Sequence, residues 1–243
     1  MFKADAGLNR PILVCAVPVR ELRPLGALAG CEAVELRLDY MGGELGSNLA
    51  GLRGFIEDLL SEFRAIVTVR DPGEGGASNV DPGLKVKVLS MAAEAGALID
   101  VEVDFIKAHR DLAGFRDRVI LSRHILKRVD GIRGIIMSDY SVANSMHAFA
   151  YKIAAINDGD LPALIELLVN EGETPVAIIP MSPIHRAVSI MLGTALMYCA
   201  VDGGTAPGQL SIQDCVRIKG ERVRLIEATR NHPYQPHSTV THP

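Results

Sequence analysis

The stretch YKIAAI, residues 151–156, is a short and mostly apolar run of the kind that forms a buried strand. It is one of eight such candidate strands, which are ILVCAV from Ile12, AVELRL from Ala33, AIVTVR from Ala65, LIDVEV from Leu98, VILSRH from Val119, YKIAAI from Tyr151, VAIIPM from Val176 and MYCAV from Met197. Because helical patterns separate them, they predict parallel strands joined by helices. Eight such units in 243 residues predict an α/β fold, a closed (β/α)8 TIM barrel, as a single domain over residues 1–243.

Two stretches between these runs show the apolar periodicity of helices that pack on a sheet. They are the stripe of Leu49, Leu52, Phe55, Ile56, Leu59 and Phe63 and the stripe of Leu161, Leu164, Leu167 and Leu168. A last helical pattern begins near Ser211. From about Arg230 to Pro243 the chain is polar and contains several prolines, which predicts a flexible tail. The tail histidines share no face of one element, so we expect no native metal site from His232, His237 and His242.

Composition and charge argue against several classes of function. The chain has 25 basic and 29 acidic residues without long runs of either, so no surface for nucleic acid is predicted. No apolar stretch approaches the ~18 residues that a bilayer span needs, so no membrane span is predicted. The four cysteines lie far apart and form no CxxC pair, so we expect reduced, packed thiols in a cytoplasmic protein. They are Cys15, Cys31, Cys199 and Cys215.

Lys152 and His124 are the side chains best suited to catalysis. Lys152 lies inside an apolar strand, where burial disfavours the ammonium form and favours an amine that can form a Schiff base with a carbonyl. The alternative is a buried ion pair, for example with Glu102. His124 ends the fifth strand on the same face as Ile120 and Ser122, so it points into the barrel mouth one strand from Lys152. A histidine there can remove and return a proton, although a lone histidine at such a position is more often a packed core residue.

Further charged side chains accompany this pair at the strand ends. The turn DPGEGG after Arg70 carries Glu74 back over the barrel mouth, where it can orient the histidine. The alternative is a solvent-exposed turn with an incidental acid. Glu35 and Arg37 are two residues apart on the second strand, so both face inward. They can bind ring hydroxyls or form a structural ion pair, and Asp39 can hold Arg37 in place.

The segment DGGTAPGQLS after the eighth strand is rich in Gly and Pro and leads into the last helical pattern, so it can close over a substrate. Barrels often bind phosphate at this position, and Gly203 with Gly204 leaves open a Schiff-base aldolase that acts on a phosphorylated sugar. Thr205 and Gln209 instead offer uncharged hydrogen bonds, which suit a carboxylate or a hydroxyl.

The ordered set of ELRLD, TVRDPGEGG, SRH, YKI, HR and TAPGQ resembles the type I 3-dehydroquinate dehydratases over nearly the whole barrel. That resemblance implies a hydro-lyase that converts 3-dehydroquinate to 3-dehydroshikimate in the shikimate pathway, without cofactor or metal, as a homodimer. It also implies that Lys152 forms the imine, that His124 is the general acid and base, and that Glu74 steers His124. The substrate-binding residues that it implies are Glu35, Arg37, Arg70, Arg186, Thr205 and Gln209.

The chain departs from the family pattern at two places that bear on the site. Ile125 follows His124 where the family usually has Asp or Asn. The segment MSPIHR, which ends at Arg186, is shorter than in the family and has His185 in place of Ser, which leaves the register of Arg186 open. A Schiff-base aldolase and a non-catalytic binding barrel stay open as alternative functions. The arginines, with no lysine in the last loop, favour a carboxylated polyol over a phosphorylated sugar.

Overall fold

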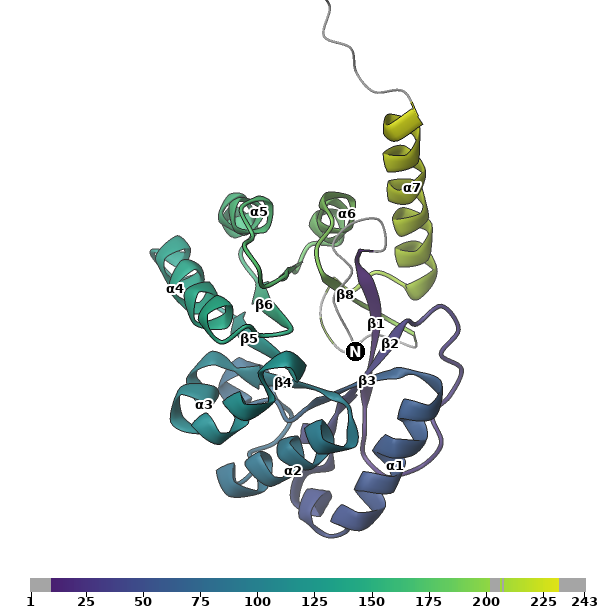
Figure 1. Cartoon of the computed structure of the whole chain (residues 1–243), viewed down its shortest axis with the longest axis vertical. Helices are drawn as coiled ribbons and strands as arrows, with labels where there is room; N and C mark the ends of the chain where they lie inside the picture. The colour runs from purple at the N-terminus through teal and green to yellow at the C-terminus, as the bar shows by residue number, and fades with distance from the viewer. Residues whose placement is uncertain (1–9, 202–205, 207, 232–243) are drawn as a thin grey trace, which may run out of the picture.

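The computed structural model describes residues 10–201, 206 and 208–231. Its eight parallel strands form one sheet in the order β7-β6-β5-β4-β3-β2-β1-β8, which curls into a barrel (Figure 1). The strands are β1 (Ile12–Pro18), β2 (Ala33–Arg37), β3 (Arg64–Thr68), β4 (Leu98–Glu102), β5 (Val119–Ile125), β6 (Ala150–Ala155), β7 (Val176–Pro180) and β8 (Leu196–Cys199). Each of the eight runs identified in the sequence forms one of these strands, which confirms the predicted TIM-barrel fold.

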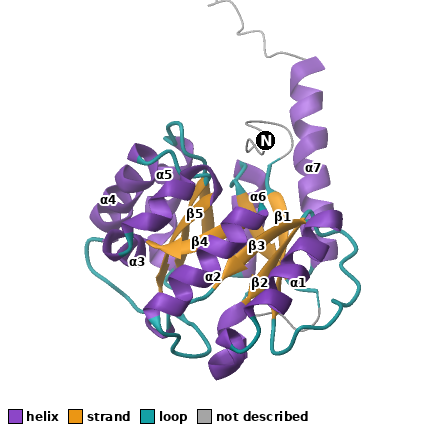
Figure 2. Ribbon diagram, turned by 60° about the horizontal axis from the view of Figure 1, so that its bottom comes forward, coloured by secondary structure: helices purple, strands orange, loops and turns teal. Residues whose placement is uncertain are grey.

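From β2 onward helices join successive strands, whereas β1 and β2 are joined by a segment without a helix. The helices surround the sheet (Figure 2). The α-helices are α1 (Leu49–Glu62), α2 (Pro82–Ala95), α3 (Val103–Ala108), α4 (Ile132–Ser145), α5 (Leu161–Val169), α6 (Pro183–Leu192) and α7 (Ile212–Asn231). Short 3-10 helices occupy Leu38–Gly46 (η1), Pro72–Glu74 (η2), Arg110–Arg118 (η3) and Asp158–Asp160 (η4). No helix in the described part of the chain combines the length and apolar character of a membrane span.

The predicted helices form where the apolar stripes placed them. On α1 the buried positions are Leu52, Ile56 and Leu59, and the helix starts at Asn48, whose Oδ1 accepts the backbone N–H of Gly51 at 2.8 Å. The helix α7 begins one residue after Ser211 and continues to the start of the predicted tail. Residues 232–243, with the three tail histidines, lie outside the described residues.

Strand alternation separates two apolar layers. On β2, Val34 and Leu36 face outward and belong to the large core between sheet and helices. The barrel interior holds a smaller apolar cluster that includes Ile66 of β3 and Ile120 of β5. Two positions further along those strands the inward side chains are the buried hydroxyls of Thr68 and Ser122. The interior therefore changes from apolar to polar toward the C-terminal ends of the strands.

The barrel closes between β7 and β8, the two ends of the strand ladder, without a regular pairing of these strands. The Ala195 N–H donates to the Val176 carbonyl at 2.8 Å, and the Ile178 N–H donates to Oγ1 of Thr194 at 2.9 Å. A buried side-chain hydroxyl thus satisfies a backbone donor that a longer β8 would have bonded. The predicted closed barrel is therefore nearly closed.

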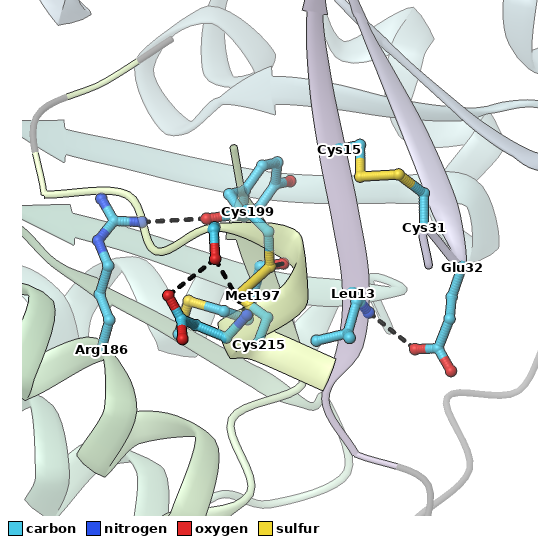
Figure 3. Close-up of a disulfide and its surroundings, with 11 residues drawn as sticks. Leu13, Cys15, Cys31, Glu32, Arg186, Met197, Cys199 and Cys215 are labelled. Carbon is cyan, nitrogen blue, oxygen red and sulfur yellow. Dashed lines mark hydrogen bonds between the residues drawn. A yellow bond between two sulfur atoms is a disulfide. The ribbon is translucent and has the colours of Figure 1, made fainter. Parts of the chain in front are cut away.

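The four cysteines form two disulfides, so the expectation of reduced thiols is wrong (Figure 3). Cys15 of β1 and Cys199 of β8 are register partners on neighbouring strands, and each is bonded to a cysteine 16 residues away. The Cα atoms lie 5.7 Å apart for Cys15–Cys31 and 6.7 Å apart for Cys199–Cys215, within the span of a disulfide. The pairing could not be predicted from the sequence, because the partners are 16 residues apart and only the folded chain brings them together.

Candidate active site

A cavity of about 340 Å³ opens at the C-terminal ends of the strands, where barrel active sites lie. The predicted site residues that line it are Glu35, Arg37, Arg70, Glu74, His124, Lys152, Arg186 and Gln209. Thr205 lies outside the described residues. Apolar side chains such as Ile156, Ile179 and Met181 complete the walls. The structure thus brings the predicted residues that it describes into one cavity of a size that suits a small ring compound.

Lys152 is buried in the barrel interior, with its amine at the cavity. Its Nζ forms an ion pair with Oδ2 of Asp100 and lies 3.9 Å from Oε1 of Glu35. The ring of Tyr198 lies 4.5 Å from the same nitrogen, close enough for a cation–π contact. The lysine is therefore fixed by two anions and an aromatic ring, and once it loses a proton it can attack a carbonyl in the cavity.

Glu102, considered from the sequence as an ion-pair partner of Lys152, binds other cations. Its Oε2 contacts Nζ of Lys85 at 2.6 Å, and its Oε1 accepts from Nη1 of Arg70 at 3.0 Å. Lys152 does form the buried ion pair that the sequence left open as an alternative, but its partner is Asp100, two residues before Glu102 on β4.

Arg70 lies beneath the cavity with both terminal nitrogens bound by protein groups. Nη2 donates to Oδ1 of Asp100 at 2.6 Å, and Nη1 donates to Oε1 of Glu102 and to Oγ of Ser122 at 2.8 Å. Burial disfavours the charged guanidinium, but the two carboxylates outweigh it and raise the pKa of Arg70. The arginine is a permanent cation that holds Asp100 in place.

His124 and Glu74 form the contact predicted between them. Nδ1 of His124 lies 3.0 Å from Oε2 of Glu74, and the same oxygen accepts the backbone N–H of His124 at 2.8 Å. Burial lowers the pKa of His124 well below its ordinary value, and the cations Arg70 and Lys152 act in the same direction. Burial raises the pKa of Glu74 to about 7. Ile125, which follows the histidine, packs in the core outside the sheet.

The turn after β3 carries Glu74 to this position. Oδ1 of Asp71 accepts the Gly73 N–H at 2.7 Å and starts the 3-10 helix η2, which ends at Gly75 with a φ of 89°. A Cβ on Gly76 would overlap the Arg70 carbonyl. The glycines of DPGEGG are therefore required by the tight return of the chain, which presents Glu74 to the histidine.

Arg37 is held by Asp39, as the sequence suggested. Its Nε and Nη2 donate to the two carboxylate oxygens of Asp39 at 2.9 Å each, and Nη2 also donates to the Gly75 carbonyl at 3.3 Å. Glu35, two positions earlier, accepts from the buried hydroxyl of Thr68 at 2.7 Å. Glu35 and Arg37 both face the cavity. No hydrogen bond or ion pair joins Glu35 to Arg37 within the described residues, which leaves both able to bind substrate groups.

Arg186 reaches the cavity from the first turn of α6 despite the short MSPIHR segment. Its side chain is almost fully buried, and its Nη1 donates to the Tyr198 carbonyl at 3.3 Å (Figure 3). Burial lowers the pKa of Arg186 to about 10. The neighbouring His185 is outside the cavity lining, with Nδ1 at 3.1 Å from Oδ1 of Asp158. The register left open by the sequence is therefore one that places Arg186 at the cavity.

The segment between β8 and α7 contributes Ala206 and Gln209 to the cavity wall. Oε1 of Gln209 accepts the Ala206 N–H at 3.2 Å. Gly208 has a φ of 68°, and a Cβ there would overlap the Met181 carbonyl. The glycine of APGQ is thus needed for this segment to lie close against the end of β7.

Two cavity or near-cavity groups were absent from the sequence-based set. Asp100 is fully buried on β4, and Tyr198 of β8 lines the cavity. The signal for Asp100 was present, because Asp100 and Glu102 are two positions apart on LIDVE and must face inward together, as Glu35 and Arg37 do. Tyr198 had no such signal, since an aromatic residue in an apolar run is typical of a packed strand.

Comparison with known proteins places these features in a family context. A model of the type I 3-dehydroquinase family matches residues 19–219. The 3-dehydroquinate dehydratase of Metallosphaera sedula is 33% identical over 219 residues, which cover 87% of this chain and 98% of the relative. That of Ignicoccus hospitalis is 34% identical and covers 82% of this chain and 89% of the relative.

Solved structures show the same fold. The type I 3-dehydroquinate dehydratase of Clostridium difficile, solved with covalently modified comenic acid, has a TM-score of 0.73 at 21% identity and covers 89% of this chain and 93% of its own. The 3-dehydroquinate dehydratase of Geobacillus kaustophilus has a TM-score of 0.71 at 18% identity and covers 93% of both chains. At these identities the likeness concerns the fold.

Proposed function

The chain belongs to the type I 3-dehydroquinase family, and from this membership we infer that it converts 3-dehydroquinate to 3-dehydroshikimate and water. It is a hydro-lyase of the shikimate pathway to aromatic compounds. The aldolase and the non-catalytic barrel that the sequence left open find no support among these relatives. The observation that carries the proposal is that Lys152 and His124 reach one cavity from the neighbouring strands β6 and β5.

In the proposed reaction Lys152 is the nucleophile. Its ammonium gives up one proton, the neutral amine adds to the ring ketone, and the return of that proton to the carbinolamine lets its hydroxyl leave as water. A protonated imine between Nζ and the ring carbon remains. The positive nitrogen makes the adjacent C–H acidic, because the electrons of that bond can move toward it. Burial of the lysine beside the cavity supports this role, since few waters compete with the ketone there.

His124 is the proposed general base and acid. Nδ1 faces Glu74, so Nε2 is the nitrogen that can take the proton adjacent to the imine. The enamine that results expels the hydroxyl on the next carbon, which leaves as water after His124 returns the proton to it. Water then hydrolyses the conjugated imine and frees Lys152. One water is consumed for the one lost at imine formation, so the net reaction releases one water.

The remaining predicted residues are assigned to substrate binding. We propose that Arg186 binds the carboxylate, because its buried guanidinium gains most from an anion. Arg37 and Glu35, fixed by Asp39 and Thr68, are suited to ring hydroxyls. Gln209 offers an amide at the cavity wall. Thr205 and Arg70 stay predictions as direct substrate contacts, and the nitrogens of Arg70 described above already serve protein carboxylates.

Reductive trapping tests the proposed imine. Borohydride added with 3-dehydroquinate should inactivate the enzyme irreversibly and add the mass of one reduced ligand, located on Lys152 by peptide mass spectrometry. Lys152→Ala is the matched control and should gain no mass. An unchanged mass of the wild-type protein under turnover would exclude the imine.

A homodimer and a cytoplasmic location are further parts of the proposal. Exposed apolar side chains follow one another at helical spacing along α6 and support a subunit contact there, namely Ile184, Val188, Met191 and Leu192. Light scattering that finds a monomer at micromolar concentration would exclude the dimer. With the cysteines paired, the cytoplasmic location rests on the biosynthetic role, and cell fractionation with an antibody tests it.

A further inference from the structure

Asp100 connects the two cations beneath the cavity. Its Oδ1 accepts from Nη2 of Arg70 and from Oγ of Ser122, each at 2.6 Å. Its Oδ2 contacts Nζ of Lys152 and has no hydrogen-bond partner beyond that ion pair among the described residues. One oxygen therefore fixes the carboxylate, and the other is directed at the nitrogen that the proposed reaction uses.

The proposed imine needs a partner of this kind. While it is protonated, the imine carries a full positive charge in a site that is largely removed from water. If it lost that proton, the neutral imine would be a much poorer acceptor for the electrons released at the adjacent carbon. A group that stabilises the protonated form therefore acts on the steps in which the proton is removed and the hydroxyl departs.

We propose that Asp100 is the counter-ion of the imine on Lys152 and keeps that imine protonated through proton removal and hydroxyl departure. This inference rests on the imine mechanism proposed above. The amine that becomes the imine nitrogen already lies against Oδ2, so its remaining N–H keeps a carboxylate acceptor without rearrangement.

The surroundings of Lys152 favour Asp100 over other groups for this role. The charged or titratable side chains around the amine are Glu35 of β2, Arg70 after β3, Asp100 and Glu102 of β4, His124 of β5 and Tyr198 of β8. Glu35 is farther, with Oε1 at 3.9 Å, and that oxygen also accepts from Thr68. Arg70 adds positive charge, as does His124 once it has taken the proton, and both work against the iminium.

Asp100 is ionised in this setting. Burial alone would raise the pKa of Asp100, but the cations Arg70 and Lys152 outweigh it and lower that pKa. Without the charge of Asp100, the positive charges of Arg70 and the iminium would repel each other with no carboxylate bound to both. The cost would fall on the protonated imine, because the arginine cannot lose its proton.

The pH at which the imine loses its proton tests the inference. Asp100→Asn keeps the shape of the side chain and removes its charge. Cyanoborohydride reduces protonated imines selectively, so its trapping rate with 3-dehydroquinate reports the protonated fraction across the pH range. In the variant, the pH at which the trapping rate and kcat decline should be lower by about one unit or more. At a fixed alkaline pH this shift corresponds to a loss of about tenfold.

Glu102→Gln is the matched control. It also removes one carboxylate from Arg70, but it does not touch Lys152. Whatever it costs in rate, it should leave the alkaline limb at the wild-type pH. A uniform loss of rate in Asp100→Asn with an unshifted limb would show that Asp100 only maintains the structure and would overturn the counter-ion role. Absence of trapping in the wild type would overturn the imine itself, which is a different result.

A measurement on the wild type covers the case in which Asp100→Asn does not fold. With ¹⁵N-labelled lysine and added 3-dehydroquinate, the nitrogen shift distinguishes protonated from neutral imine. The bound imine should stay protonated at a pH where the imine of the same ketone with a simple amine in water is neutral. A neutral bound imine at that pH would overturn the inference.

Discussion

Oε2 of Glu74 accepts the backbone N–H of His124 at 2.8 Å and lies 3.0 Å from Nδ1 of the same residue. A carboxylate oxygen can only accept hydrogen bonds, so its contact with the ring is a hydrogen bond only if Nδ1 carries the proton. The hydrogen bonds therefore assign the ring proton to Nδ1. In the proposed mechanism the unprotonated Nε2 is then the nitrogen that takes the substrate proton. One carboxylate thereby fixes both the backbone and the tautomer of the proposed base.

The first prediction is an acid limb in the pH profile of kcat/KM. Glu74 must be ionised to accept the Nδ1–H, and burial raises the pKa of Glu74 to about 7, so activity should rise as the pH increases through about 7. Glu74→Gln keeps an oxygen but does not titrate. That variant should lose the limb and about 10²-fold or more in turnover. An unchanged limb in Glu74→Gln would assign it to another group.

The same titration acts on stability with the opposite sign. Because the pKa of Glu74 is raised in the folded protein above the ordinary 4.5, the native state binds the proton more tightly than the unfolded chain does. The contribution to stability is present below about pH 4.5 and is lost as the pH rises through about 7. Since Gln does not titrate, the free energy of unfolding of the wild type minus that of Glu74→Gln should become more negative as the pH rises from about 4.5 to about 7 in urea titrations. A wild type that gains stability relative to the variant over this range would contradict the assignment.

The second prediction concerns His124→Ala. Proton transfer is the main contribution of His124, so turnover should fall by about 10²–10⁴-fold while imine formation, slowed, stays detectable by borohydride trapping. The separation of the two effects is the test. Near-normal turnover would assign the base to another residue, with Glu74 as the first candidate.

The sequence predicted best those features that depend on residues close together along the chain. The eight apolar runs predicted the strands because a buried parallel strand needs apolar side chains on both faces, as in YKIAAI. Alternation then placed Glu35 and Arg37 inside the barrel. The site residues on strand ends could be predicted because a barrel brings all such ends together.

Features that depend on exact tertiary distance were not predictable in this way. The Cys199–Cys215 pair required the return of α7 over β8, and the Cys15–Cys31 pair required the path of the segment between β1 and β2. The partner of Lys152 required the register between β4 and β6 across β5. Between β7 and β8 the hydroxyl of Thr194 accepts a backbone N–H in place of a strand partner, and strand propensities do not predict such a contact. The ion pair of Asp100 with Lys152 was not predicted, because Glu102 was the partner considered for that lysine.

The third prediction concerns the Cys199–Cys215 disulfide, which encloses the segment carrying Gln209. Replacing both cysteines by serine releases a loop of about 15 residues and should lower stability by about 3 kcal/mol. Because the segment that holds Gln209 loses an anchor, KM should also rise. Thermal unfolding and steady-state kinetics measure the two effects.

Cys15→Ser with Cys31→Ser is the comparison for that variant. It removes the disulfide between β1 and the segment before β2, whose loop does not contain Gln209, so it should lower stability with a smaller change in KM. Thiol titration of the native wild-type protein should find four unreactive cysteines, which become reactive after reduction in denaturant. Free thiols in the native, oxidised protein would contradict the pairing.

The last prediction concerns Arg186, which the proposed function assigns to the substrate carboxylate. Its guanidinium is buried, and burial lowers its pKa to about 10, so a bound carboxylate would stabilise a charge that the site otherwise disfavours. Arg186→Ala should cost about 2–5 kcal/mol in kcat/KM, and because the carboxylate is remote from the forming imine, most of the loss should appear in KM. Arg186→Lys should recover only part of the affinity, since an ammonium cannot reproduce the two parallel hydrogen bonds of a guanidinium. His185→Ala, next in sequence but facing Asp158, should leave KM near the wild-type value. If both Arg186 variants kept the wild-type KM, the carboxylate would have another partner, and Arg37, which already faces the cavity with a fixed orientation, would be the residue to test next.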